Sequence, residues 1–166
     1  MIVKTVGKLN LAIPTDREIV MTREFDAPRE LVFEALTTPK LLKQWFKGPG
    51  WDLAVCEFDA RVGGRYRYVW KLGDNEMGMS GEIKEFRAPE RMVATEKFDQ
   101  AWYPGDAQSS IVLTAKGTKT LLTLTVTYAS KEARDQVLKS PMAEGASAGY
   151  DRLEEFLADR HAGAKA

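Results

Sequence analysis

The sequence predicts an α+β protein in which one antiparallel sheet is covered by a long C-terminal helix. Between residues 52 and 128, six segments of strand character follow one another, with short turn-forming connections and one longer loop at 100–108. Short connections imply antiparallel neighbours. Helical periodicity is confined to residues 28–46 and to the last quarter of the chain. Together with a first strand at 17–25, these observations predict a curved seven-stranded sheet. The terminal helix is the only element long enough to cover its apolar face.

The N-terminal elements are a strand and two short helices. Residues 17–25 alternate between apolar and polar side chains, as a half-buried strand does. The helices are expected at 28–36 and 39–46, each with a proline in its first turn. Gly48-Pro49-Gly50 ends the second helix. Two short helices are therefore expected between strands 1 and 2.

The remaining six strands are expected at 52–60, 65–72, 76–86, 91–98, 109–115 and 120–128. The last of these alternates most sharply. It places Leu122, Leu124, Val126 and Tyr128 on one face and threonines on the other. A sheet with one buried and one solvated face is expected from this pattern.

The last quarter of the chain is helical again. Ser130 is a cap for a helix at 131–138, and Pro141 interrupts the chain before a long helix at 142–157. Residues 1–16 are expected to be an N-terminal extension, 17–160 the domain, and 161–166 a flexible tail.

Composition excludes several classes of function. Lysine plus arginine balances aspartate plus glutamate at 24 each, so neither non-specific nucleic-acid binding nor polybasic membrane binding is expected. No apolar stretch approaches the length of a membrane span, and the single cysteine, Cys56, forbids an internal disulfide. We expect a soluble, cytoplasmic protein without membrane insertion.

The histidine count limits the chemistry further. The only histidine, His161, lies in the expected tail. Catalytic systems that pair a serine or cysteine with a histidine need a positioned imidazole, and so do most zinc sites. We therefore expect no metal and no cofactor. Any catalysis would use carboxylates, tyrosine, lysine, arginine or bound water.

The segment GGRYRYVW, residues 63–70, combines turn residues, arginines and aromatics. A strand rather than a helix follows Gly63-Gly64, so these glycines indicate a tight turn and not a phosphate loop. Alternation places Arg65 and Arg67 on the face opposite the aromatic side chains. The arginines are then expected in surface ion pairs, with Glu57 and Asp59 of the preceding strand as candidate partners.

The aromatics of this segment face the expected core. Tyr66, Tyr68 and Trp70 lie opposite a covering helix whose central residues, 145–149, are all small. Two interpretations stay open: the helix backbone lies tight on the sheet, or space for a ligand remains between them.

Three acids lie on strands, and the pattern leaves their orientations open. They are Glu57, Glu85 and Glu96. Among them, Glu96 is a candidate general acid or base, with Tyr66 as its candidate partner.

Four segments together resemble a known family. REFDAPRELVFEALTTPKLLKQWF, the following GPGW, CEFDARVGGRYRYVW and MAEGASAGYDRLEEFL are similar to the START-like (SRPBCC, Bet v 1-like) superfamily. Within it they most resemble bacterial single-domain members of the group named after the activator of the Hsp90 ATPase. The likeness runs from about Arg17 to about Ala158.

The resemblance implies a helix-grip fold with an internal cavity, in a superfamily whose members bind lipids, sterols or polyketides and include a few aromatase/cyclases. Trp45 and Trp51 would lie near the mouth of this cavity. Carried onto this sequence, its lining would be Tyr66, Tyr68, Trp70, Met79, Phe98, Met142, Gly145, Gly149 and Leu153. The co-chaperone that names the group has a further N-terminal domain that makes major contacts with the chaperone. No such domain is present in this sequence, so the resemblance does not lead us to expect chaperone activation.

Three hypotheses on function follow. The first is binding of a small hydrophobic or amphipathic ligand between sheet and helix. The second is a metal-free cyclase or lyase that uses a cavity tyrosine and a carboxylate. The third is a regulator of an Hsp90-type ATPase or a protein-interaction module, including a homodimer formed through Trp102 and Tyr103.

Overall fold

The computed structural model describes residues 2–165, and side chains are described for residues 2–160. The predicted flexible tail, residues 161–166, and His161 with it, lie outside the residues whose side chains are described. The helices are α1 (Arg29–Thr37), α2 (Pro39–Trp45), α3 (Lys131–Lys139) and α4 (Met142–Lys165). The strands are β1 (Ile2–Val6), β2 (Leu9–Ala12), β3 (Glu18–Phe25), β4 (Asp52–Phe58), β5 (Arg65–Leu72), β6 (Asn75–Arg87), β7 (Arg91–Phe98), β8 (Ala107–Lys116) and β9 (Lys119–Thr127).

All strands of the described chain form one antiparallel sheet in the order β1-β2-β3-β9-β8-β7-β6-β5-β4. The seven predicted strands are confirmed as β3 to β9, and the predicted number of strands is wrong because β1 and β2 precede them. Residues 1–16 resemble an extension in sequence because β1 is exposed along nearly its whole length and carries no burial pattern. Gly7, at φ +59°, turns the chain into β2, which buries Leu9 and Leu11.

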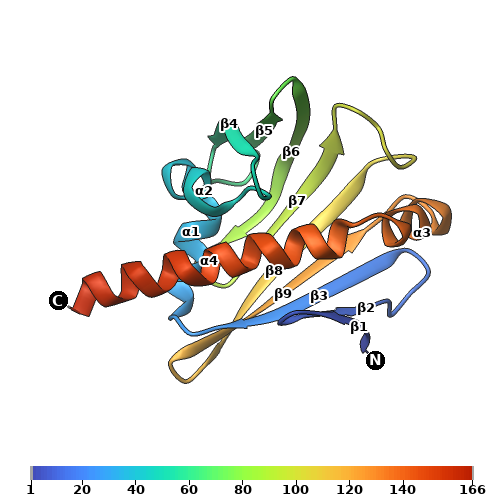
Figure 1. The fold of residues 1–166 in the computed structure, drawn as a ribbon. Helices are drawn as coiled ribbons and strands as arrows, with labels where there is room; N and C mark the ends of the chain where they lie inside the picture. Colours follow the sequence, from blue (N-terminus) through green and yellow to red (C-terminus); the bar gives the residue numbers. More distant parts are fainter. Residues whose placement is uncertain (1, 166) are drawn as a thin grey trace.

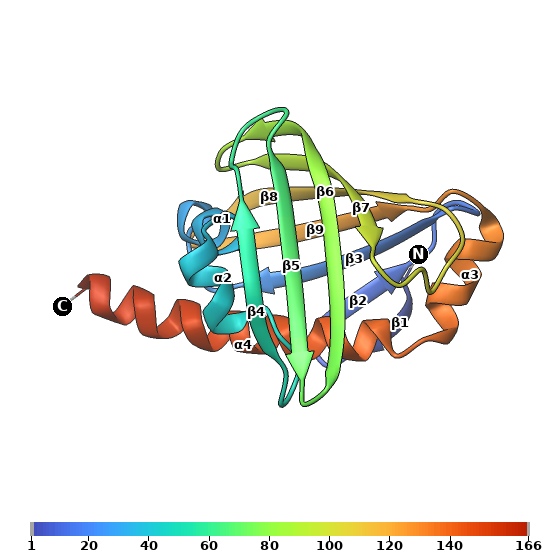
Figure 2. The ribbon, with the colours of Figure 1, turned by 90° about the horizontal axis from the view of Figure 1, so that it is seen from above.

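The sheet is strongly curved (Figures 1 and 2). In Figure 2, strands β4 to β6 cross the direction of β3, β8 and β9 steeply, so that the two halves of the sheet form a concave surface. The pairing register shifts between Ile83 and Glu85 of β6, and between Leu53 and Val55 of β4. Such bulges bend a strand and increase its twist, and they contribute to this curvature.

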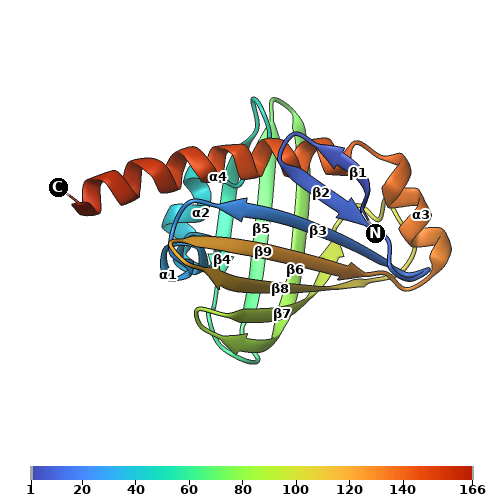
Figure 3. The same cartoon turned by 90° about the horizontal axis from the view of Figure 1, so that it is seen from below.

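Helix α4 lies across the concave face, with α1 and α2 beside its C-terminal half (Figure 1). Its main backbone contacts are with α1, α2, α3, β1 and β2. Figure 3 shows the β1–β2 hairpin along the other flank of the helix. The helix buries Ala143, Tyr150, Leu153 and Leu157 in the core. This is the arrangement of a helix-grip fold.

A buried arginine joins α4 to the sheet. Arg23 of β3 is 1 % exposed, and its Nη1 donates to Asp151 Oδ1 at 2.7 Å. Glu154 Oε2 lies 3.6 Å from its Nη2. Neither Nε nor Nη2 has a hydrogen-bond partner in the described chain. Since a buried cation needs a counter-charge, this pair fixes one side of α4 against β3.

Capping of α3 follows the sequence prediction, since the Ser130 side chain accepts a hydrogen bond from the backbone N–H of Ala133 at 3.1 Å. No helix in the described residues combines the length and the hydropathy needed to cross a membrane.

Candidate functional site

The turn before β5 has the predicted origin. Gly63 adopts φ +83°, a conformation that favours glycine. A side chain at Gly64 would collide with the backbone oxygen of Asp59. These glycines therefore make a tight turn, and β5 follows directly from Arg65.

The arginines of β5 lie on the convex face of the sheet. Arg65 is exposed, and Arg67 forms two hydrogen bonds with the carboxylate of Asp99, at 3.1 and 2.7 Å. The predicted register is confirmed, because Glu57 is paired with Arg67 across the hairpin. The predicted partner is wrong, because Asp99 reaches Arg67 over Gly78, where no side chain intervenes.

The aromatic side chains of β5 lie on the concave face, as predicted. Tyr66, Tyr68 and Trp70 are all buried. The Tyr66 hydroxyl donates to the backbone oxygen of Thr95 at 2.5 Å. A Cβ at Gly81 would lie only 2.6 Å from Cε1 of the same tyrosine. Glycine at position 81 therefore allows the Tyr66 ring to lie flat on the sheet.

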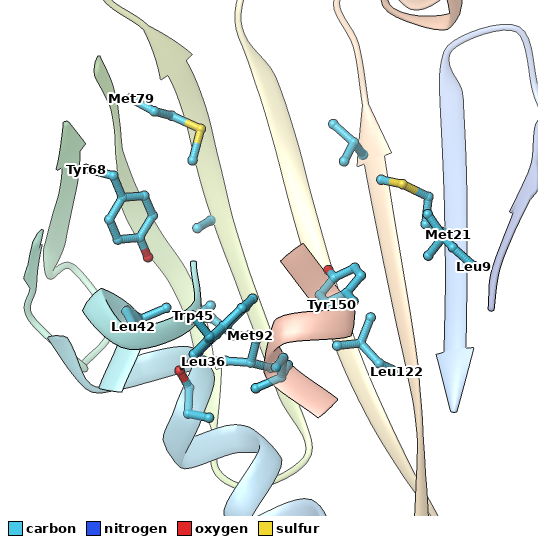
Figure 4. Packing of buried hydrophobic residues seen from close by; sticks show 14 of the residues in the cluster. Leu9, Met21, Leu36, Leu42, Trp45, Tyr68, Met79, Met92, Leu122 and Tyr150 are labelled. Atoms are coloured by element: carbon cyan, nitrogen blue, oxygen red, sulfur yellow. Dashed lines mark hydrogen bonds between the residues drawn. The ribbon is translucent and has the colours of Figure 1, made fainter. Parts of the chain in front are cut away.

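Tyr68 is buried without a polar partner. Its ring packs against Tyr66 at 5.0 Å and Phe46 at 5.2 Å between centroids. Burial first, then the neighbouring Tyr66 and Cys56, hold the pKa of its hydroxyl well above the usual range. Figure 4 shows Tyr68 and Met79 extending from the sheet toward the side of the core where Tyr150 of α4 lies. The hydroxyl of Tyr68 therefore has no hydrogen-bond partner among the described residues.

Glu96 occupies the concave face of β7. Met92 and Ala94, four and two residues before it, belong to the core, and its strand partner is the buried Ala107. Burial raises the pKa of the Glu96 carboxyl to about 7, although the residue as a whole keeps some access to solvent. The hydrogen bond from the Tyr103 hydroxyl to Oε1, at 3.4 Å, opposes this rise only weakly.

Three tyrosines surround this carboxyl, and together with it they are called the Glu96 site below. They are Tyr66 from β5, Tyr103 from the loop between β7 and β8, and Tyr128, which follows β9. Burial, followed by the negative charge of Glu96, raises the pKa of each hydroxyl far above its usual range. The rings of Tyr103 and Tyr128 meet edge to face with centroids 5.2 Å apart. The site thus combines one carboxyl with three neutral hydroxyls.

A pocket of about 110 Å³ opens beside this site and is called the loop pocket below. Its lining consists of Lys97, Phe98, Ala101, Trp102, Tyr103, Gly105 and Asp106. The rings of Phe98, Trp102 and Tyr103 meet one another edge to face at centroid distances of 5.0 to 6.0 Å. Tyr103 belongs to both features, since its ring lines the pocket and its hydroxyl contacts Glu96.

The small residues of α4 lie differently from the prediction. Gly145 is exposed and does not face the sheet. Gly149 is partly buried, and no atom lies within 4 Å of the position that its Cβ would occupy. The periodicity of the helix explains the difference, because the core-facing stripe runs through Ala143, Tyr150 and Leu153, and Gly145 lies outside this stripe.

The remaining predicted lining residues divide between core and rim. Trp45, expected near a mouth, is 2 % exposed. Its Nε1 donates to the backbone oxygen of Ala35, which makes it a core residue. Trp51 is only partly buried. The indole of Trp70 donates to the backbone oxygen of Phe46 at 2.7 Å. Four further residues contribute to the same core: Leu153 is fully buried, Met79 is nearly so, and Phe98 and Met142 pack against it partly exposed.

The orientations of the strand acids are now fixed. Glu57 and Glu85 are exposed, and Glu85 accepts a hydrogen bond from Arg91 at 2.8 Å. Only Glu96 of the three lies on the concave face. Among the described residues, no group of three histidine, cysteine or acidic side chains is placed to hold a metal ion.

Two members of the site were not predicted as site residues. Tyr128 was assigned to the buried face of its strand, but its nearness to Glu96 depends on the order of β7, β8 and β9 in the sheet. Tyr103 lies in a loop, where side-chain direction has no periodic signal. The sequence signals available for them were the place of Tyr128 on the buried face of its strand and the aromatic residues of the loop that contains Tyr103.

Comparison with known proteins identifies the family. The family model described as "Activator of Hsp90 ATPase homolog 1-like protein" matches residues 26–158. This chain belongs to that family. The predicted resemblance is confirmed, and with it the START-like helix-grip fold. No curated protein matches the chain.

Solved structures of bacterial proteins share the fold of this family member. A protein from Rhodobacter sphaeroides is 29 % identical, with a TM-score of 0.88 over 92 % of this chain and 99 % of its own. One from Nitrosomonas europaea is 25 % identical, with a TM-score of 0.79 over 90 % and 99 %. One from Mycobacterium smegmatis is 26 % identical, with a TM-score of 0.78 over 89 % and 94 %. Their names state no ligand or reaction.

Proposed function

We propose that this protein binds a small amphipathic ligand on the concave face of the sheet, with the polar end of the ligand at the Glu96 site. The carboxyl of Glu96 carries the proposal. Its hydrogen bond from Tyr103 is long, at 3.4 Å, whereas buried polar groups are nearly always well hydrogen-bonded. A ligand that contributes a hydrogen-bonding group satisfies this carboxyl.

The apolar part of the ligand lies between α4 and strands β5 and β6. The side chains offered there are Tyr68 and Met79 from the sheet and Met142 from the helix, all of them buried or partly buried. Helix α4 is held by β1, β2, α1 and α2. Gly149 lies two residues, or about 200° around the helix, from Ser147, and so on the flank away from β1 and β2. The β1–β2 flank is marked by the bond from the Ser147 hydroxyl to the backbone oxygen of Val6.

A pair of helix variants tests this placement. Both Gly149→Leu and Gly145→Leu replace a glycine in α4, so both gain helix propensity. Gly149 is partly buried whereas Gly145 is exposed, so we expect only the leucine at 149 to reach between helix and sheet. The neutral fluorescent probe N-phenyl-1-naphthylamine is titrated into each protein. We expect the wild type and the Gly145 variant to bind it alike and the Gly149 variant to bind it several-fold more weakly.

Equal binding by all three proteins places the probe elsewhere and contradicts the site. A wild type that does not bind the probe contradicts the proposed function itself. Mass spectrometry of the purified protein under native conditions gives an independent check, since a retained small molecule adds a discrete mass.

A second candidate function is acid–base catalysis on an apolar substrate. The pKa of about 7 at Glu96 favours it, because a general acid or base works best when its pKa lies near the operating pH. The test is turnover of compounds related to a bound molecule. Turnover by the wild type that is lost in Glu96→Gln, while the variant still binds the compound, would establish catalysis by Glu96. An unchanged rate in that variant would exclude Glu96 as the catalyst. The predicted homodimer and the regulatory role at an ATPase stay predictions.

A further inference from the structure

The ionisable groups that interact with Glu96 among the described residues include no cation. The titratable side chains that act on Glu96, or on which it acts, are Tyr66, Tyr103 and Tyr128. No lysine or arginine of the described residues is among them. Its strand neighbour Lys97 is exposed, and alternation directs it to the other face. The two buried cations of the described residues, Arg23 and Arg134, are paired with Asp151 and Asp135 respectively. An ionised Glu96 therefore has no counter-charge within the described part of the protein.

The surroundings of the carboxyl are aromatic. The rings of Tyr103 and Tyr128 lie 5.2 Å apart between centroids, those of Tyr66 and Tyr68 5.0 Å, and Phe98 packs on Tyr103 at 6.0 Å. Aromatic faces attract cations, most strongly where water is excluded. A carboxylate without a counter-charge, set among aromatic rings, is the complement of an organic ammonium group.

The same arrangement disfavours the opposite charge. A ligand carboxylate at this site would face Glu96 at close range, and two carboxylates that share a site resist joint ionisation. An alcohol can hydrogen-bond to the carboxyl, but it carries no charge to be attracted or repelled. The loop pocket does not alter the balance, because its two charged lining residues, Lys97 and Asp106, carry opposite signs.

We propose that the Glu96 site selects ligands whose polar end is a protonated amine and rejects carboxylate ligands of the same shape. The inference rests on the proposed function, of which it names the ligand class. The amine donates to the Glu96 carboxylate, the tyrosine rings surround the cation, and the alkyl or aryl remainder extends toward Tyr68 and Met79.

Proton linkage follows from this chemistry. Burial keeps much of Glu96 protonated at neutral pH, since its pKa is about 7, and a bound ammonium requires the ionised form. Alkylamines stay protonated up to about pH 10, as lysine does. Lowering the pH from 8 to 6 therefore weakens amine binding by roughly tenfold, the fall in the ionised fraction of a group with this pKa, and leaves alcohol binding unchanged.

The experiment compares n-octylamine, 1-octanol and octanoate, which share a chain and differ in charge. Each is titrated at pH 8 by isothermal calorimetry into the wild type, Glu96→Gln and the matched control Glu57→Gln. The control acid is exposed on β4. We expect the order amine, alcohol, octanoate in the wild type and in the control. Glu96→Gln should weaken amine binding by about 10- to 100-fold, the range for a hydrogen bond to a charged group. It should weaken alcohol binding less, because a glutamine side chain still hydrogen-bonds to a hydroxyl.

The outcomes separate the two proposals. Alcohol binding without a preference for the amine, or an amine preference that survives in Glu96→Gln, overturns the inference and leaves the proposed function standing. Octanoate binding as tight as amine binding does the same. Absence of binding by all three ligands overturns the proposed function and the inference together.

Discussion

The hydroxyl of Tyr103, in the loop between β7 and β8, lies 3.4 Å from Oε1 of Glu96 on the concave face of β7. This contact joins a surface loop to an acid inside the curved sheet. It also joins the loop pocket to the Glu96 site, because the ring of the same tyrosine lines that pocket. The loop pocket and the Glu96 site are therefore linked through one tyrosine and one carboxyl.

Glu96→Gln should make stability less dependent on pH. The pKa of Glu96 is about 7 in the folded protein, against 4.5 for an unperturbed glutamate side chain. The folded state then binds more protons than the unfolded state between these values, so the wild type loses stability as the pH rises through this window. The loss is on the order of 2 kcal/mol, after allowance for the remaining access to solvent. Urea unfolding at pH 4.5 and 8 measures it, and an equal change in both proteins contradicts the assignment.

Removing either of two neighbouring hydroxyls should have different effects. Tyr66→Phe loses the bond to the backbone oxygen of Thr95 and should cost about 1 kcal/mol, as a typical buried hydrogen bond does. Tyr68→Phe loses no protein partner and should be neutral or slightly stabilising. Denaturant midpoints of the two variants decide the point. A larger loss in Tyr68→Phe would mean that its hydroxyl has a partner in solution.

Two glycine-to-alanine variants should change stability in opposite directions. A Cβ at Gly81 collides with the backbone of β7 and with the Tyr66 ring, and overpacking of this kind costs about 1 to 3 kcal/mol. A Cβ at Gly145 meets no atom within 4 Å, so Gly145→Ala should stabilise α4 by up to about 1 kcal/mol through helix propensity. Thermal unfolding tests both. Stabilisation by Gly81→Ala would show that the strand relaxes around the added methyl group.

The ion pair between Arg23 and Asp151 should be sensitive to which partner is removed. Asp151→Asn leaves the buried guanidinium with the backbone oxygen of Ser147 at 3.4 Å and, as its remaining counter-charge, Glu154 at 3.6 Å. Because Asp151 is more than half exposed, screening limits the cost to about 1 to 2 kcal/mol. Arg23→Met also removes two unpartnered buried N–H groups and should cost less. Chemical denaturation measures the loss in unfolding free energy of each variant. A larger loss in Arg23→Met than in Asp151→Asn would mean that Arg23 stabilises the protein through contacts beyond its ion pair with Asp151.

Much of the fold could be predicted because its signals are local. Alternation and turn residues located the seven strands from β3 to β9, and short connections gave the antiparallel order of the six from β4 to β9. The pairing of β3 with β9 was not predicted. The β1–β2 hairpin was not predicted, because its outer strand is exposed on both faces and shows no alternation of apolar and polar side chains. Its place in the sheet depends on pairing with β3, which is a tertiary contact.

The site could be predicted only in part. Alternation placed Tyr66, Tyr68 and Trp70 on the concave face, but it could not decide the direction of Glu96, since a one-residue change of register inverts a strand. Tyr103 lies in a loop without periodicity, and Tyr128 approaches Glu96 only through the order of the sheet. Gly145 was misplaced because a run of small residues covers every direction around a helix.

The most direct test of the account is the ionisation of Glu96 itself. Carboxyl carbons of the glutamates are labelled with ¹³C, and their chemical shifts are followed by NMR between pH 3 and 9. The account predicts one glutamate that titrates near pH 7, whose signal is absent from Glu96→Gln and whose midpoint falls when n-octylamine is added. If every glutamate titrates near the usual value of about 4.3, Glu96 faces water and the account of the concave site is wrong.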